Sequence, residues 1–266
     1  MGAGVGARLV EHGVTVLTTL AGRSDASAER ARVAGMQAVT DEQCARADFF
    51  LSICPPSEAP ALAARIARII AMSDQKPVYV DCNAVSPKTK IIIGDTLIKA
   101  GSRFVDVGII GLPPKGNQGP VLHASGKDAA RFAALNEFGI EIKLIDAPIG
   151  AASALKMSYA GITKGLLALA PMMMLAASRA GVAKELHNEL ARTQASLLQG
   201  FEKSVPDMFD KAYRFVGEMR EIADFAGDDL AARLMYEAVA QFYTRIAEDH
   251  AGQRQETDAL AAFLKN

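Results

Sequence analysis

Short apolar runs alternate with helical segments through the first half of the chain. Phe49–Cys54, for example, is stopped by Pro55-Pro56, and the helical pattern of Glu58–Met72 follows. Apolar strands separated by helices of roughly ten residues are typical of βαβ units on a parallel sheet covered on both faces. The pattern predicts strands at Val14–Leu20, Phe49–Cys54, Val78–Val80, Phe104–Ile110 and Val121–Ala124, with helices at Ala26–Ala34, Glu58–Met72, Pro87–Ala100 and Ala129–Phe138.

After Pro148 the pattern becomes entirely helical. Ala151–Ala180 is predicted to be one long helix, which Pro171 should kink. Further helices are expected at Lys184–Lys203, Pro206–Phe225 and Leu230–Ala251. The sequence therefore predicts an α/β domain over residues 1–148 and an all-α domain over residues 149–266.

Composition narrows the class of protein. Half of the 266 residues are hydrophobic, 22% are charged and the net charge is -1, which excludes a disordered chain and gives no sign of a nucleic-acid or membrane partner. Cys44, Cys54 and Cys82 are widely spaced and have no paired histidines, so they predict free thiols in a reducing cytoplasm and no metal site. The most apolar run, Gly165–Ala177, is shorter than the roughly 20 residues that span a bilayer, so we expect a buried core helix.

The start of the chain is rich in glycine. Gly2–Ala7 matches G-x-G-x-x-A, the phosphate-binding turn of dinucleotide-binding domains, but no strand precedes it. In a second registration Met1-Gly2 ends a longer fingerprint, Ala3–His12 is the helix after it, and the first strand is missing from this chain. A Gly/Ala-rich helix without a ligand is the third interpretation. The leading expectation is a Rossmann-like domain with its first strand apparently missing and Gly2 at the pyrophosphate.

The residues after the second expected strand indicate the cofactor. An acid at this point binds the ribose hydroxyl of NAD, whereas an arginine accommodates the 2′-phosphate of NADP. Here Arg23 and Ser24 come before the first acid, Asp25. We therefore expect NADP, with NAD less favoured; the alternative is that Arg23 is an ordinary exposed loop residue.

Several motifs, in order, resemble those of the β-hydroxyacid dehydrogenase superfamily, which includes 3-hydroxyisobutyrate and 6-phosphogluconate dehydrogenases. The similarity covers nearly the whole chain, and its C-terminal half is similar to the subgroup with a phosphogluconate-dehydrogenase-like C-terminal domain of unassigned function. The matching stretches are Gly22-Arg23-Ser24, Ala47–Ser57, Asp81–Pro87, Asp106–Gly111, Gly150–Lys156, Ser153–Gly165 and Tyr213–Met219.

This resemblance implies hydride transfer between nicotinamide and a hydroxyacid-like or sugar-acid-like substrate. It implies that Lys156 is the general acid/base, although Lys156 alone is also compatible with an ordinary surface lysine. Lys164 lies on the same helix face and either helps Lys156 or marks the solvent end of that face. By the same resemblance, Cys54, Pro55, Pro56 and Asn83 border the nicotinamide, and Asn83, Ser86, Ile110, Gly111, Lys156 and Tyr159 line the substrate site.

Two positions depart from the superfamily. Tyr159 and Ala160 replace the asparagines of K-x-x-N-N, and Ile110-Gly111-Leu112 replaces S-G-G. Both changes make the expected pocket more apolar, and Tyr159 is either an alternative proton donor or a core aromatic. Reduction of a C=N bond by an imine reductase is therefore the second hypothesis, and a truncated, catalytically impaired dimeric protein is the third. The resemblance also implies a homodimer formed through the helical domain.

Overall fold

A computed structural model describes residues 1–265, and it divides the chain into a unit of Met1–Met157 and a unit that begins at Ser158. The first unit is built on two sheets. Strands β3, β4 and β5 are parallel, β6 runs antiparallel to β5, and β7 is parallel to β6, in the spatial order β3-β4-β5-β6-β7. A separate parallel pair consists of β1 and β2. The strands are β1 (Leu17–Thr18), β2 (Gln37–Ala38), β3 (Phe49–Ser52), β4 (Val78–Asp81), β5 (Arg103–Ile110), β6 (Val121–Ser125) and β7 (Glu141–Leu144).

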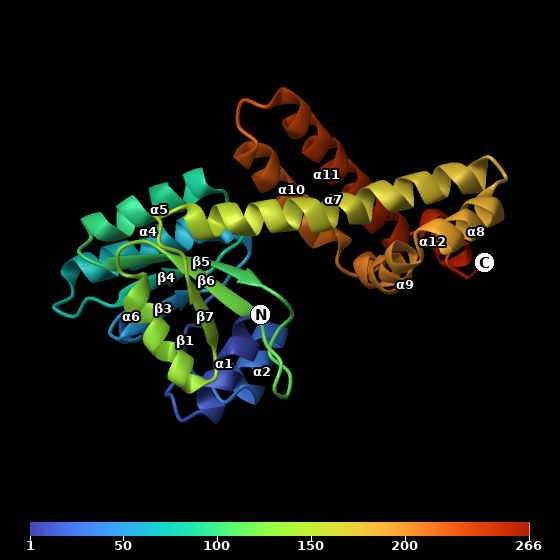
Figure 1. Ribbon diagram of the computed structural model, residues 1–266. Coiled ribbons are helices and arrows are strands. Elements are labelled where there is room, and N and C mark those ends of the chain that lie inside the picture. Colours follow the sequence, from blue (N-terminus) through green and yellow to red (C-terminus); the bar gives the residue numbers. More distant parts are fainter. Residues whose placement is uncertain (266) are drawn as a thin grey trace. The chain divides into compact units, whose positions relative to one another are not determined.

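Helices cover both faces of the larger sheet (Figure 1). On one face α1 and α6 contribute to an apolar cluster with alternate residues of β4 and β5, among them Val80 and Val107. On the other face α4 and α5 pack against Tyr79 and Phe104. The helices are α1 (Gly2–Glu11), α2 (Asp25–Val33), α3 (Asp41–Cys44), α4 (Ala59–Met72), α5 (Pro87–Lys99) and α6 (Ala129–Phe132), with 3-10 turns at Pro56–Glu58 and Ala133–Phe138.

The alternation expected of an α/β domain with a parallel sheet is confirmed, with differences at its margins. The expected strand Val14–Leu20 is reduced to two paired residues, and the expected helix Ala129–Phe138 becomes a short α-helix followed by a 3-10 turn. The elements β2, α3 and β7 were not predicted. β7 escapes pattern recognition because it is a four-residue edge strand with three exposed positions.

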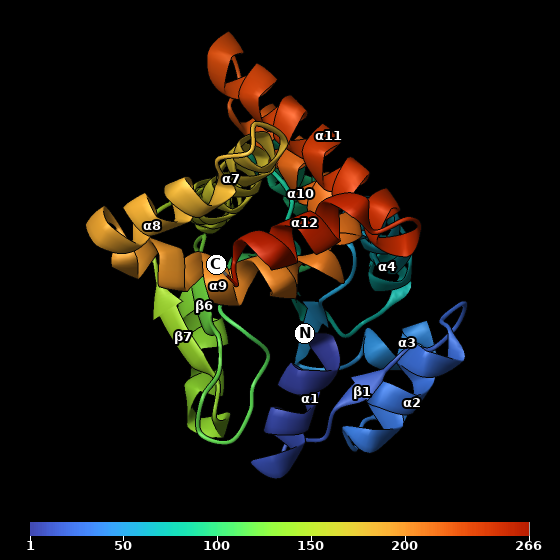
Figure 2. The ribbon, with the colours of Figure 1, turned by 90° about the vertical axis from the view of Figure 1, so that its right-hand side faces the viewer.

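The second unit consists of helices, as expected. α7 (Ala151–Arg179), which begins in the first unit, is continuous through Pro171, and α10 (Ala212–Phe225) lies along α11 (Leu230–Ala251), as Figure 2 shows. The expected helix Lys184–Lys203 is wrong: the backbone at Gln194 leaves the helical region and separates α8 (Ala183–Thr193) from α9 (Ala195–Phe209). α9 passes through Pro206, where a new helix was expected, and α12 (Gln255–Phe263) follows α11.

By length and apolar composition alone, α7 is the one helix in residues 1–265 that could cross a membrane, with a window of mean hydropathy 1.5. One such helix is weak evidence, because long helices in the cores of soluble proteins pass the same test. The expectation of a buried core helix at Gly165–Ala177 is wrong in its burial: the run is part of α7, and its residues Leu166, Leu169 and Met173 are exposed.

Candidate functional site

The carboxyl ends of the parallel strands bring several of the predicted site residues to one edge. Cys54 follows β3, Asn83 follows β4, and Ile110 ends β5. Because the three strands are parallel and adjacent, these positions lie along the same edge of the sheet. In open α/β sheets, ligands bind at this carboxyl edge.

Asn83 joins the ends of β3 and β4. Its side-chain Nδ2 donates to Ser52 Oγ at 2.8 Å and to Asp81 Oδ1 at 2.9 Å, while its Oδ1 accepts from the backbone N–H of Cys54 at 2.7 Å. The residue is only 3% exposed. Its amide is therefore committed to holding the two loops together.

The glycine-rich start of the chain is helix α1, which begins at Gly2. A Cβ at Gly2 would make only ordinary contact with Ile53, at 3.7 Å, so the start of α1 lies beside the end of β3. Gly4 and Gly6 serve packing, since a Cβ there would lie 3.1 Å from Pro114 and 2.7 Å from Met36 Sδ. The N–H groups of the first turn have no partners within the helix and form a site suited to a phosphate.

Arg23 and Ser24 lie in the exposed loop between β1 and α2, which turns at Gly22 with φ +70°. Ser24 occupies the N-cap position of α2, and its Oγ lies 3.1 Å from Ser27 Oγ. Burial raises the pKa of the Cys54 thiol, and the positive charge of Arg23 is one of the effects that oppose the rise.

Lys156 stands on the first turns of α7, directly against β5. A Cβ at Gly108 would lie 3.0 Å from Lys156 Cβ and 2.6 Å from the carbonyl oxygen of Ala152. Only a glycine on β5 therefore allows α7 to come this close. The stem of Lys156 is half-buried at this contact.

A buried carboxylate that the sequence analysis did not single out anchors this part of α7. Asp106 Oδ2 accepts from the backbone N–H of Gly150 at 2.8 Å and of Ser153 at 3.2 Å, and Oδ1 accepts from Ser153 Oγ at 2.7 Å. Ser125 Oγ donates to Asp106 at 3.1 Å and accepts from the N–H of Ala152 at 3.1 Å. The signal in the sequence that could have identified Asp106 is that it is the single acid within the otherwise apolar strand expected at Phe104–Ile110.

Other predicted residues are placed differently. Ser86 is fully buried and caps α5, because its Oγ accepts from the N–H of Thr89 at 3.3 Å. Gly111 has φ +121° and packs against Pro120, so it shapes the turn after Ile110. Tyr159 is 48% exposed, which excludes the interpretation as a core aromatic within this chain.

In the helical unit, Lys164 is engaged by its neighbours. It forms a close ion pair with Glu218 and lies 4.2 Å from the centre of the Phe215 ring. Tyr243 donates a hydrogen bond to the Lys164 carbonyl oxygen at 2.7 Å. The charge of Lys164 is thus neutralised by Glu218, and the interpretation as the solvent end of the face does not describe it.

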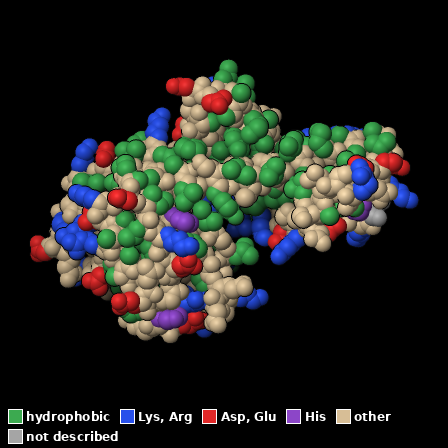
Figure 3. Space-filling model, viewed as in Figure 1, with side chains coloured by type: hydrophobic (Ala, Val, Ile, Leu, Met, Phe, Trp, Pro, Cys, Tyr) green, Lys and Arg blue, Asp and Glu red, His purple; other side chains and the backbone are tan. Residues whose placement is uncertain are grey.

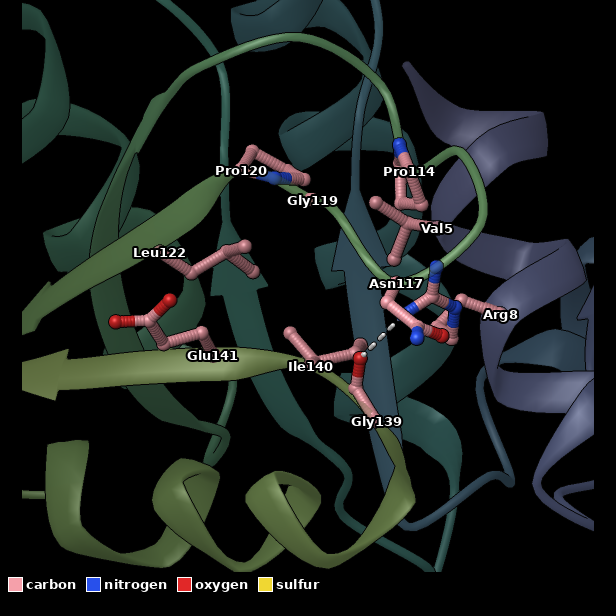
Figure 4. A pocket seen from close by; sticks show the side chains of 10 residues that line it. All are labelled: Val5, Arg8, Pro114, Asn117, Gly119, Pro120, Leu122, Gly139, Ile140 and Glu141. Carbon is pink, nitrogen blue, oxygen red and sulfur yellow. Dashed lines mark hydrogen bonds between the residues drawn. The ribbon is translucent and has the colours of Figure 1, made fainter.

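A small cavity of about 90 Å³ lies between α1, the β5–β6 loop and the start of β7 (Figure 4). Arg8 reaches into it and donates to the carbonyl oxygen of Gly139 at 3.4 Å and to that of Gly116. Sites for cofactors usually measure about 300 Å³ or more. This cavity is therefore too small to hold a dinucleotide by itself.

A larger depression of about 570 Å³ lies at the opposite, amino edge of the strands, among Phe49, Val78 and Arg103. Three of its basic side chains have local partners: Lys76 donates to the carbonyl oxygen of Ile70 in the last turn of α4, and Arg103 and Arg131 lie 3.6 and 3.5 Å from Asp128. We therefore assign these three side chains a structural role: Lys76 interacts with the negative end of a helix, and the two arginines interact with Asp128. No group of three or more His, Cys, Asp or Glu side chains within residues 1–265 could hold a metal ion.

Comparisons with known proteins show which protein family the sequence matches; the models named next are sequence models of protein families. The model described as the NAD binding domain of 6-phosphogluconate dehydrogenase matches residues 1–139, and a domain of unknown function matches residues 177–246. An uncharacterized 28.5 kDa protein of Methanothermus fervidus is 29% identical over 238 residues, which cover 88% of this chain and 91% of that protein.

Solved structures agree on the fold. A conserved protein of unknown function, described as structurally similar to 3-hydroxyacid dehydrogenases, is 29% identical, with a TM-score of 0.71 and 94% of each chain covered. The 3-hydroxyisobutyrate dehydrogenase of Mycobacterium tuberculosis is 17% identical, with a TM-score of 0.73 and coverage of 94% and 91%. The imine reductase of Streptomyces aurantiacus is 15% identical, with a TM-score of 0.54 and coverage of 100% and 96%.

Proposed function

The chain belongs to the family of the NAD-binding domain of 6-phosphogluconate dehydrogenase, and from this we propose that it is an NADP-dependent oxidoreductase. Its substrate in this proposal is a hydroxyacid-like or sugar-acid-like compound. The observation that carries the proposal is the carboxyl edge of the sheet, to which the start of α1, the linked Cys54 and Asn83 loops, and Lys156 all converge.

The residues at this edge fit a dinucleotide. The first turn of α1 at Gly2 offers unpaired N–H groups and an uncrowded Cα for the pyrophosphate. Arg23 and Ser24, exposed in the next loop, would hold the 2′-phosphate, and the loops of Cys54-Pro55-Pro56 and Asn83 would border the nicotinamide. When bound, the cofactor would accept or donate the hydride.

Lys156 supplies the proton step in this proposal. When an alcohol is oxidised, the carbinol carbon loses a hydride and its oxygen loses a proton, which passes to Lys156 Nζ. In the reverse direction Lys156 returns the proton to the carbonyl oxygen. Gly108 and Asp106 fix the turn of α7 that carries this amine.

Fluorescence titration with NADPH and NADH tests the cofactor assignment. We expect NADPH to bind more tightly, and Arg23→Ala to weaken NADPH binding by about 10-fold or more, since a charge-assisted contact to phosphate is lost. NADH binding should not change. Arg32→Ala, which removes an exposed arginine paired with Glu29 on α2, is the matched control. Equal affinities of the unaltered chain for both cofactors would contradict the NADP assignment.

Turnover tests the role of Lys156. Small hydroxy acids and sugar acids are screened with NADP, and Lys156→Met is compared with the unaltered chain on whichever substrate reacts. Loss of general acid/base catalysis should lower kcat by about 100-fold or more, with NADPH affinity unchanged. Lys88→Met, an exposed lysine on α5, is the control. Full activity of Lys156→Met would remove Lys156 from the chemistry.

Imine reduction is the second candidate, because of one observation. Ile110-Gly111-Leu112 stands where hydroxyacid dehydrogenases have S-G-G, so Ile110 replaces the serine hydroxyl, and Leu112, which is 78% exposed, replaces a glycine. The exposed Tyr159 hydroxyl offers a proton donor for a C=N nitrogen. Cyclic imines assayed beside hydroxy acids with the same NADPH preparation decide between the two reactions.

The surface of α7 supports a homodimer as part of the proposal. Its exposed apolar residues follow the alternating three- and four-residue spacing of a coiled-coil seam, and Figure 3 shows hydrophobic side chains gathered along its course. A second copy presents the same stripe, so two α7 helices can cover each other. The residues are Tyr159, Ile162, Leu166, Leu169 and Met173.

The proposal places the protein in the cytoplasm. Cys44, Cys54 and Cys82 are free thiols, as expected in a reducing compartment. The apolar stripe on α7 is assigned to a second copy of this chain, with neither a membrane nor a nucleic acid as partner.

A further inference from the structure

Lys90 is a completely buried charged side chain near the candidate site. It comes from α5, beneath the carboxyl edge, and is 0% exposed. Its Nζ donates to Asp81 Oδ1 at 2.7 Å, to the Asp81 carbonyl oxygen at 2.9 Å and to the Asn83 carbonyl oxygen at 3.2 Å. An ammonium has three protons, so these bonds use all of them.

The same ammonium also faces the carboxylate that anchors α7. Lys90 Nζ lies 3.6 Å from Asp106 Oδ1, and both side chains are completely buried. Asp81 and Asp106 sit at paired positions on the neighbouring strands β4 and β5. A single cation therefore stands between two adjacent buried carboxylates.

The charge of Lys90 is maintained by these neighbours. Burial lowers the pKa of the ammonium, but the two carboxylates more than offset this effect, and the pKa lies above its ordinary value. One oxygen of Asp81, Oδ2, is buried without a hydrogen-bond partner among residues 1–265. That carboxylate thus depends strongly on the positive charge of Lys90.

Each carboxylate leads to a different part of the site. Asp81 Oδ1 also accepts from the backbone N–H of Asn83 at 2.9 Å, which shapes the loop after β4. Asp106 caps the first turn of α7 through Gly150 and Ser153, one turn before Lys156. We propose that Lys90 is a positioning residue for Lys156. The buried ammonium of Lys90 holds the first turn of α7 and the Asn83 loop at the same edge of the sheet.

The inference rests on the proposed function for its catalytic meaning, but the mechanical link can be tested alone. Hydrogen–deuterium exchange of the full chain, without cofactor, reports on the amides of residues 150–157. Lys90→Met keeps the volume and removes the charge, which leaves Asp81 and Asp106 to repel each other. Lys88→Met, two residues away and exposed on the same helix, is the control.

In Lys90→Met we expect exchange in residues 150–157 to be faster by about 10-fold or more, while the interior of α4 keeps its protection. The rate at which an acylating reagent labels Lys156, followed against pH by mass spectrometry, should change as well. The double variant Lys90→Met/Asp106→Asn removes both charges of one pair and should restore part of the protection. Unchanged exchange and labelling, or an equal acceleration throughout the first unit, would overturn the proposal.

If Lys90→Met does not fold, Ser153→Ala removes one bond to Asp106 and leaves Lys90 in place. The same residues should then exchange faster by about threefold, and no change would again overturn the proposal. Failure of the unaltered chain to bind NADPH would contradict the proposed function, whereas the exchange result would stand independently of it.

Discussion

At Gly108 the lack of a side chain decides how closely α7 approaches the sheet. We expect Gly108→Ala to destabilise the protein by about 1–3 kcal/mol, because the added methyl would lie 2.6 Å from the Ala152 carbonyl oxygen. The displaced turn carries Lys156, so turnover should fall more than NADPH affinity. Urea unfolding and cofactor titration measure the two effects.

Gly217 provides the opposite case as a control. It lies inside α10, and a Cβ there would meet nothing within 4 Å. Gly217→Ala should therefore stabilise the protein by about 0.5–1 kcal/mol, since alanine loses less backbone freedom in a helix. If both variants change stability in the same direction, the close approach at Gly108 is not what distinguishes them.

Residue roles were only partly visible in the sequence. The motif comparison singled out Asn83 and Lys156, and the structure places both on elements that meet at the carboxyl edge. The motif comparison did not reveal that the side-chain amide of Asn83 is fully engaged in hydrogen bonds with Ser52, Asp81 and Cys54. Which partner satisfies a polar side chain depends on neighbours from distant parts of the chain.

At the scale of elements, Ser86 shows how a loop residue can serve a helix. It accepts from the N–H of Thr89 at the start of α5 and is fully buried. Ser86→Ala should cost about 1 kcal/mol of stability by removing this cap, and NADPH affinity should be unchanged. Denaturant unfolding checks the first effect, and Ser86→Thr should recover it. A large loss of substrate turnover at normal stability would instead return Ser86 to the substrate site.

Elements with strong periodicity were predicted well, and short ones were not. The helix expected at Leu230–Ala251 is α11, and that expected at Glu58–Met72 differs from α4 by one residue. By contrast, β1 and β2 have only two residues each, and α8 and α9 are divided at Gln194 without any proline or glycine. Because no helix-breaking residue marks this position, local propensity does not predict the break.

At the scale of the whole molecule, the exposed stripe on α7 predicts the oligomeric state. We expect sedimentation equilibrium to give about twice the chain mass of 28.2 kDa, because each large apolar side chain buried at the seam contributes about 1.5–3 kcal/mol. The double variant Leu166→Glu/Leu169→Glu should be a monomer. Met72→Glu, which alters a side chain that is 92% exposed on α4, should leave the mass unchanged.

The same preparations distinguish other uses of the stripe. A wild-type chain that is monomeric at micromolar concentration would contradict the homodimer. Flotation with phospholipid vesicles would then show whether the apolar face of α7 meets a membrane instead, an outcome that would contradict the proposal that the protein has no membrane partner.

By itself, the sequence determined the succession of apolar strands and helices, the change to an all-helical second half, and the family motifs, because these depend on residues close together in the chain. Only the tertiary structure decided which of two lysines on one helix is buried: Lys88 is exposed, whereas Lys90 lies on the same buried stripe as Ile93 and Leu97. Because Ile91, Ile92 and Ile93 are consecutive apolar residues, the sequence does not show which face of the helix is buried. The burial of Lys90 is set by the carboxylates of two neighbouring strands, and long-range electrostatic partners of this kind are assembled only when the sheet forms.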